Sequence, residues 1–378
     1  MSLPRLARVV LDNSILLVLG TTTALIWANV DYSTYTSASH VLHFAVNDIL
    51  MAFFFALAAK EVFEATLPGG SLSSPAQAVS PLAAAAGGML APALIYALLS
   101  TSVGPSDLLR GWAIPCATDI AFSAMVAKAL FPARHPAVPF LLLLAIADDA
   151  FGLIILALFY PSGSLSLLAL GSCMAGAILA ALALRRHGVR SFWPYLLVPG
   201  SLSWAGLYLG GFHPALALVP VIPFLPHSAR DLGLFDRREE RRLDTLSRFE
   251  HWWAAPVQVI LFFFGFANAG VPLAAIGPGT YYVLAALLVG KPLGILALTL
   301  GTRLLGSRAK TLPLRDLALV GICASIGFTV SLFFATAAFP DGDALVQTKM
   351  GALFSLAAAP IAWGVSRLFP ARRMIENP

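Results

Sequence analysis

Two adjacent aspartates, Asp148 and Asp149, lie in the middle of the apolar stretch VPFLLLLAIADDAFGLIILALFY. Neighbouring residues of a helix point about 100° apart, so one carboxylate can face a cavity while the other faces an adjacent helix. Close carboxylates repel each other and burial disfavours their charge, so such a pair can hold a proton and release it when a cation arrives. The pair therefore predicts cation binding coupled to proton exchange. The alternative is a purely structural pair of buried acids satisfied by arginine or backbone partners.

A second acid, Asp119, lies in the apolar segment GWAIPCATDIAFSAMVAKAL. Pro115 removes a backbone hydrogen bond, and the side chains of Thr118 and Asp119 compete for backbone groups, so we predict a broken helix here. Asp119 is then either an ion ligand or a carboxylate that neutralises two helix N-termini meeting head to head. We favour the second role, with Thr118 as the direct oxygen ligand.

One lysine, Lys291, lies in the middle of the apolar segment YYVLAALLVGKPLGILALTL. A buried ammonium needs an anion, and Asp148 and Asp149 are the candidates. Alternatively, Lys291 compensates the helix C-termini of a second broken segment, ICASIGFTVSLF. The two interrupted segments share the related strings CATDIAFS and CASIGFT. Interrupted segments at corresponding positions in two halves of a chain point to a transporter binding site.

Four further residues are candidates for an ion funnel or a pH response. Glu61 and Glu64 belong either to a solvated helix end or to a charged funnel that attracts cations. His213 is either structural or a pH sensor, because histidine titrates in the physiological range. Glu250, beside His251 at the start of a predicted span, completes this group.

The elements that must hold these residues are transmembrane helices. Of the 378 residues, 58% are hydrophobic and only 11% are charged, whereas a soluble domain carries about 25% charged residues. This composition excludes a soluble protein and predicts one all-α membrane domain over residues 1–378. Three isolated cysteines predict neither a disulfide framework nor a zinc site. The net charge of +5 reflects membrane topology rather than nucleic-acid binding.

Hydropathy and breaker residues predict about twelve spans. They are 11–30, 41–63, 77–100, 108–127, 137–160, 165–184, 192–209, 211–226, 249–274, 280–302, 314–338 and 345–369. If the N-terminus is cytoplasmic, all but four of the 24 lysine and arginine residues fall on the cytoplasmic side. Such alternation follows the positive-inside rule, so we expect both termini in the cytoplasm.

From about residue 11 to 369 the chain resembles the NhaA family of bacterial sodium–proton antiporters. The segments that carry this resemblance are VNDILMAFFFALAAKEVFEATLPGGSL, GWAIPCATDIAF, LLAIADDAFGLIILALFYP, FANAGV, VGKPLGI and IGFTVSLF. Their order and spacing over the whole chain make the resemblance specific. It implies a bundle of twelve helices with inverted repeats, an architecture of which this family is itself a known example, and two broken helices that cross near the ion site.

The resemblance also assigns roles to residues. It implies that Asp149 is the core cation ligand, and that Asp148 is associated with Lys291. The Thr-Asp motif of the broken helix falls on Thr118 and Asp119. The family's funnel acid and pH-response histidine correspond to Glu61 and His213. We accordingly expect Asp149, Asp148 and Thr118 to supply the Na⁺ ligands.

The chain also departs from the family pattern. Ala150 and Phe151 follow the acid pair in place of Leu-Gly, and Phe63 and Glu64 replace basic residues after the funnel acid. Ser325 replaces the first glycine of the second broken helix, and the stretch FEHWWAAPVQ differs from the family's histidine-rich start of the ninth span. These changes bear on the pH set-point and on the choice among Na⁺, Li⁺ and K⁺.

The expected activity is exchange of Na⁺, and of Li⁺, for H⁺ across the bacterial inner membrane, in sodium and pH homeostasis. We expect a homodimer in the lipid bilayer, without a cofactor, a nucleic-acid partner or an enzymatic activity. A cation-coupled solute symporter is the first alternative, which the lack of buried cations or amides beyond Lys291 argues against. An intramembrane aspartyl protease needs two aspartates on different helices, which only Asp119 with Asp149 could supply.

Overall fold

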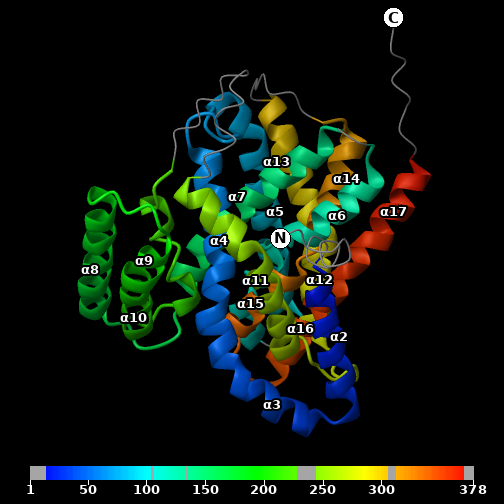
Figure 1. Cartoon of the computed structure of the whole chain (residues 1–378). Coiled ribbons are helices and arrows are strands. Elements are labelled where there is room, and N and C mark those ends of the chain that lie inside the picture. Colours follow the sequence, from blue (N-terminus) through cyan, green and yellow to red (C-terminus); the bar gives the residue numbers. More distant parts are fainter. Residues whose placement is uncertain (1–13, 104–105, 133–134, 228–243, 305–311, 370–378) are drawn as a thin grey trace, which may run out of the picture.

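The computed structural model of the chain describes residues 14–103, 106–132, 135–227, 244–304 and 312–369. Within these ranges the structure is built of helices and contains no β-strand (Figure 1). A helix satisfies its own backbone hydrogen bonds where no water can do so, which suits this apolar sequence. The predicted all-α architecture is confirmed.

The helices follow one another closely along the chain. In order they are α2 (Ile15–Val30), α3 (Tyr32–Phe44), η1 (Ala45–Leu50), α4 (Met51–Thr66), α5 (Pro75–Ser102), η2 (Ser106–Gly111), η3 (Ile114–Cys116), α6 (Ile120–Leu130), α7 (Ala137–Phe159), α8 (Leu167–Arg186), α9 (Trp193–Tyr195), η4 (Leu196–Gly200), α10 (Ser201–Gly210), η5 (Pro214–Leu216), η6 (Ile222–Phe224), α11 (Thr245–Asn268), α12 (Pro278–Ala285), η8 (Ala286–Gly290), α13 (Lys291–Leu304), α14 (Leu314–Ala324), α15 (Phe328–Ala338), α16 (Gly342–Phe354), η9 (Ser355–Ala357) and α17 (Ala358–Leu368).

Several of these helices join into membrane-length units. Among the described residues, six helical stretches are long and apolar enough to cross a membrane. Two further pairs of helices pass the same test together but are bent at a break, which brings the number to eight. The bends are 47° between Asp107–Cys116 and Ile120–Leu130, and 49° between α14 and α15. The two broken helices predicted from the sequence are therefore present.

One predicted span, 211–226, is not a continuous helix. The segment contains only the three-residue 3₁₀-helices η5 and η6, joined by turns. The reason is its proline content: Pro214, Pro220, Pro223 and Pro226 each lack the backbone N–H that an α-helix needs. Helical structure is found at every other predicted span. Most ends differ by a few residues, but the helical stretch at the predicted span 41–63 runs from Tyr32 to Thr66.

The helix that carries Lys291 is held against α5 by close backbone contact. A Cβ atom added to Gly294 on α13 would lie 1.9 Å from the carbonyl oxygen of Gly87 on α5, and one added to Gly87 would lie 2.0 Å from that of Gly294. Small residues allow helix backbones to approach in membranes, where van der Waals packing holds helices together. Since Gly294 lies one turn from Lys291, this contact fixes the position of the lysine.

We expect Gly294→Ala to lower the melting temperature of the detergent-purified protein. The added methyl group meets backbone atoms that cannot rotate away, and overpacking of this kind costs about 1–3 kcal/mol. Gly301→Ala on the same helix is the matched control, because a Cβ there meets no atom within 4 Å. Equal melting temperatures for the two variants would contradict the proposed role of the α5–α13 contact.

Candidate ion-binding site

The two broken helices cross at their breaks. Residues 117–119 separate η3 from α6, and residues 325–327 separate α14 from α15. The two breaks contact each other, because the backbone N–H of Asp119 donates to the carbonyl oxygen of Ile326 at 2.7 Å. Irregular backbone at this depth is tolerated only where protein groups or a cavity satisfy it. The crossing therefore supplies some of the backbone hydrogen bonds that the breaks leave unmade.

Asp119 binds the N-terminal ends of α6 and α15, which are the second halves of the two broken helices. One carboxylate oxygen accepts a hydrogen bond from the backbone N–H of Phe122 at 3.2 Å, in the first turn of α6. The other accepts from the backbone N–H of Thr329 at 3.1 Å, in the first turn of α15, and from the hydroxyl of Thr329. Helix N-termini carry partial positive charge. This geometry favours Asp119 as the compensating carboxylate rather than as an ion ligand.

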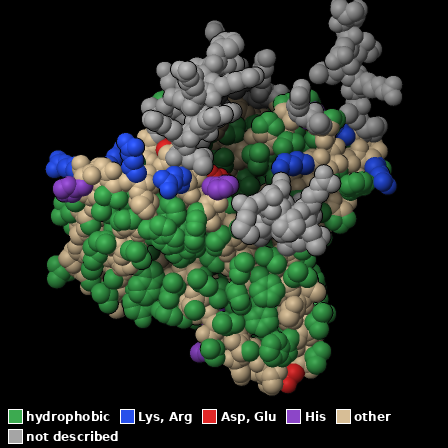
Figure 2. Space-filling view, in the orientation of Figure 1, with side chains coloured by type: hydrophobic (Ala, Val, Ile, Leu, Met, Phe, Trp, Pro, Cys, Tyr) green, Lys and Arg blue, Asp and Glu red, His purple; other side chains and the backbone are tan. Residues whose placement is uncertain are grey.

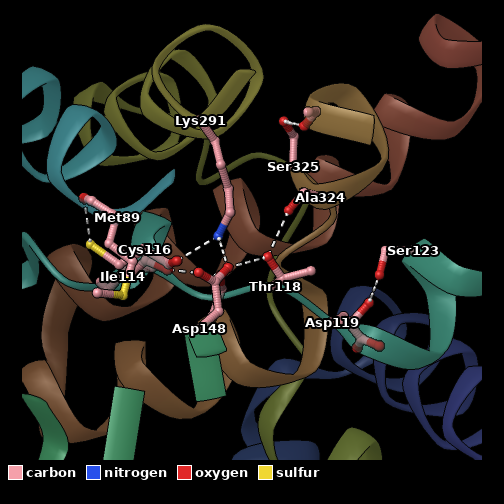
Figure 3. Close-up of polar contacts among 12 residues, drawn as sticks. Met89, Ile114, Cys116, Thr118, Asp119, Ser123, Asp148, Lys291, Ala324 and Ser325 are labelled. Carbon is pink, nitrogen blue, oxygen red and sulfur yellow. Dashed lines mark hydrogen bonds and ion pairs between the residues drawn. The ribbon is translucent and has the colours of Figure 1, made fainter. Parts of the chain in front are cut away.

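Lys291 is paired with Asp148. Their Nζ and Oδ2 atoms are 3.0 Å apart, and neither side chain is exposed to solvent. Lys291 also donates to the carbonyl oxygen of Cys116 at the end of η3 (Figure 3). The lysine thus neutralises the carbonyl end of the first broken helix, whereas the sequence alternative had placed it at the second.

Thr118 links the pair to the second break. Its hydroxyl lies 2.7 Å from Oδ2 of Asp148 and 3.1 Å from the carbonyl oxygen of Ala324, the last residue of α14 (Figure 3). A hydroxyl has one proton, so it donates to one of these oxygens at a time. The other carboxylate oxygen of Asp148 is buried and has no hydrogen-bond partner within the described residues.

Asp149 faces away from this network, as the 100° turn between neighbours predicts. It lines a cavity of about 210 Å³ together with Glu61 from α4 and Gln258 from α11. Thr118, Asp119 and Thr329 line the same cavity. Asp149 also lines a smaller pocket that it shares with Asp148. The adjacent aspartates are therefore divided, one locked by Lys291 and the other open to a cavity.

The remaining sequence candidates lie outside this cavity. Glu64 forms an ion pair with buried Lys60 at 2.8 Å, and Glu250 from α11 also pairs with Lys60. The three side chains join α4 to α11 instead of forming a solvated helix end. His213 is buried, with its ring 4.8 Å from that of Phe333, and its Nδ1 lies 3.9 Å from a carboxylate oxygen of Asp48.

Sequence reasoning missed three residues near the site. Lys60 was visible as an i, i+4 partner of Glu64 in an apolar stretch, a spacing that favours ion pairs. Thr329 lies in the second broken segment predicted from the sequence, but its bond to Asp119 depends on the crossing of the two segments. Gln258 could not be singled out from the sequence, because a single amide does not stand out in the hydropathy of a helix that starts with charged residues.

We expect Lys291→Met to destabilise the protein by about 3–5 kcal/mol, because it leaves the Asp148 carboxylate buried without its counter-charge. The double variant Asp148→Asn/Lys291→Met removes both charges and should recover much of this loss. Lys128→Met, at an exposed position on α6, is the matched control. Thermal unfolding in detergent measures all three, and a double variant no more stable than the single one would contradict the pairing.

Comparison with known proteins assigns the chain to a family. The sequence model of the family "Na+/H+ antiporter 1" matches residues 6–366. The chain belongs to this family. The Na⁺/H⁺ antiporter NhaA of Geobacter metallireducens is 46% identical over 371 residues, which are 96% of this chain and 97% of that protein. NhaA 1 of Pelobacter propionicus is 44% identical over 375 residues, again 96% of this chain and 97% of the relative.

A solved structure supports the fold independently. The sodium proton antiporter MjNhaP1 from Methanocaldococcus jannaschii at pH 8 aligns with a TM-score of 0.56 and 17% sequence identity. The alignment covers 94% of this chain and 91% of that one. At this identity the likeness concerns the fold alone.

Proposed function

We propose that this member of the Na⁺/H⁺ antiporter family exchanges Na⁺ for H⁺, and that Asp149 is the carboxylate at which the two ions compete. The observation that carries the proposal is the division of the aspartate pair. Asp148 is bound by Lys291 and Thr118, whereas Asp149 lines the cavity. Of the two aspartates, only Asp149 lines this cavity.

Competition at one carboxylate couples the two ions. A bare charge in a low-dielectric interior is costly, whereas a protonated or cation-bound carboxylate is neutral. The carrier therefore changes its accessible side more readily when Asp149 holds a proton or a cation than when it is empty. Protonation then drives one direction of the cycle and cation binding the other. We propose that Asp148 and Thr118 assist at the cation-bound stage, with Li⁺ as a second substrate.

The dimensions of the site disfavour the alternatives. Pockets for organic ligands usually enclose about 300–1,000 Å³, and the cavity beside Asp149 is smaller, at about 210 Å³. It suits an ion with some water rather than a symported solute. A protease dyad would require a free Asp119, but that carboxylate is held by the first turns of α6 and α15. The family consists of transporters, and we propose no enzymatic activity.

We expect Asp149→Asn to abolish Na⁺-driven dequenching of a ΔpH probe in everted membrane vesicles. The amide keeps the shape of the carboxylate but can neither release a proton nor bind a cation as an anion does. Asp343→Asn, at an exposed acid of α16, is the control and should retain full activity. Normal activity of Asp149→Asn, or no response of the wild type to NaCl at any pH, would refute the proposal.

The chain is a multi-pass membrane protein, and we propose the bacterial inner membrane with both termini in the cytoplasm. The argument is the distribution of basic residues along the sequence. It agrees with Figure 2, where the lysine and arginine side chains of the visible face form a band across the upper part. Below that band the same face is largely hydrophobic. We also propose that the protein is a homodimer, on the basis of its resemblance to the NhaA family.

A C-terminal fusion to green fluorescent protein tests both points. We expect bright fluorescence in cells, because this reporter folds on the cytoplasmic side and fails after export by the general secretion route. Light scattering of the purified fusion should give the mass of two copies. Dark cells with well-expressed fusion would contradict the orientation, and a mass of one copy would contradict the dimer.

A further inference from the structure

Gln258 is a polar residue of the cavity that the exchange at Asp149 does not account for. It lies on α11 and lines the cavity together with Glu61 and Asp149. Its amide oxygen is buried and has no hydrogen-bond donor within the described part of the chain. Leaving such a group without a partner costs about 1–3 kcal/mol. A buried acceptor of this kind requires an explanation, and an ion is one of the accepted ones.

Three other polar side chains of the cavity, those of Thr118, Asp119 and Thr329, are held by protein groups. Asp119 accepts bonds from Phe122 and Thr329, and the Thr329 hydroxyl is used in that interaction. The Thr118 hydroxyl lies between Asp148 and Ala324. The Asp119 oxygens accept bonds from protein donors and the two threonine hydroxyls donate their protons, whereas the Gln258 amide oxygen is buried with no hydrogen-bond partner in the described part of the chain.

A cation at Asp149 needs such neutral oxygens. Within the described residues, no three His, Cys, Asp or Glu side chains come close enough to hold a metal ion together. Hard cations take several oxygen ligands, and carbonyl and amide oxygens serve alongside carboxylates. The rest of the shell around a cation at Asp149 must then come from water and from neutral protein oxygens.

The Gln258 side chain can present its oxygen to the cavity. The residue is partly exposed while its oxygen is turned inward. The last side-chain torsion of glutamine has two broad, roughly equivalent positions. A half-turn about this bond exchanges the amide oxygen and nitrogen and moves no other heavy atom.

We propose that the amide oxygen of Gln258 is a ligand of the cation that Asp149 binds, and that it biases the competition at Asp149 toward the cation. This inference rests on the exchange at Asp149 proposed above. A proton on Asp149 completes a neutral carboxyl group and needs no further oxygen. A cation loses water ligands when it binds, and each protein oxygen around it replaces one of them. Gln258 thus favours the cation-bound state and leaves the protonated state nearly unchanged.

The experiment measures the apparent KM for Na⁺ and for Li⁺ in everted vesicles at fixed pH, with Gln258→Leu and Gln258→Glu. The contact between the Gln258 oxygen and the cation should contribute about as much free energy as a hydrogen bond to a charged group. We therefore expect Gln258→Leu to raise the apparent KM about tenfold or more. The maximal rate at saturating Na⁺ should stay close to that of the wild type. Gln258→Glu keeps an oxygen at this position, so its KM at alkaline pH should stay within about threefold of the wild type.

Val259→Leu, at an exposed neighbour on α11 outside the cavity, is the matched control. Calorimetry on purified protein adds a second readout. The buffer takes up the proton that Na⁺ displaces from Asp149, so the measured heat of Na⁺ binding depends on the buffer used. Gln258→Leu should weaken this binding in parallel with the rise in KM, without a fall in melting temperature, because it removes a buried polar group that has no partner.

Two outcomes would overturn the inference. One is a KM of Gln258→Leu within twofold of the wild type for both ions. The other is a joint loss of maximal rate and melting temperature in Gln258→Leu and Gln258→Glu alike, which would show a packing role. A wild type that neither responds to Na⁺ nor binds it would instead refute the exchange at Asp149 itself, so the two failures are distinguishable.

Discussion

The interior of a membrane offers no water to the backbone groups that a broken helix leaves unpaired. Two breaks in one bilayer-spanning bundle would each be unfavourable alone, and the structure resolves this by placing them against each other. The carboxylate of Asp119 satisfies the N–H ends of α6 and α15, and Lys291 satisfies the carbonyl end of η3. Both charges are therefore structural requirements of the crossing, and the ion site is built on top of them.

The same constraint explains why two aspartates stand side by side. A buried lysine needs an anion, and Asp148 supplies it from α7. Once Asp148 is committed to this pair, the next residue along the helix points elsewhere and is available for exchange. One acid thus anchors the crossing while its neighbour lines the cavity. Within one helical turn, the acid pair combines a structural role for Asp148 with the transport role that we propose for Asp149.

Phe333 of α15 is the centre of an aromatic layer. Phe333, one turn after Thr329 on α15, is fully buried, and its ring lies 4.8 Å from those of Phe55 and His213. Behind it the buried amides of Asn47 and Asn268 bond to each other in both directions. His213 belongs to this layer rather than to the cavity, which gives the histidine a packing environment of its own.

The sequence alone determined the class of protein and the broken segments, and it singled out Asp148, Asp149 and Lys291 as candidates. Charges in an apolar helix are so costly that their presence is informative without any knowledge of neighbours. The sequence also predicted a helix at 211–226, where four prolines prevent one, because hydropathy measures apolar character and not backbone hydrogen bonding.

Only the tertiary structure decided which acid meets which partner. The pairing of Asp148 with Lys291, the capture of two helix ends by Asp119 and the link from Lys60 to Glu250 join residues far apart in the chain. Gln258 was likewise invisible in the sequence, since its amide gains meaning only from the cavity it lines. Local composition fixes where a charge or a break occurs, but the crossing of helices fixes the distances on which ion binding depends.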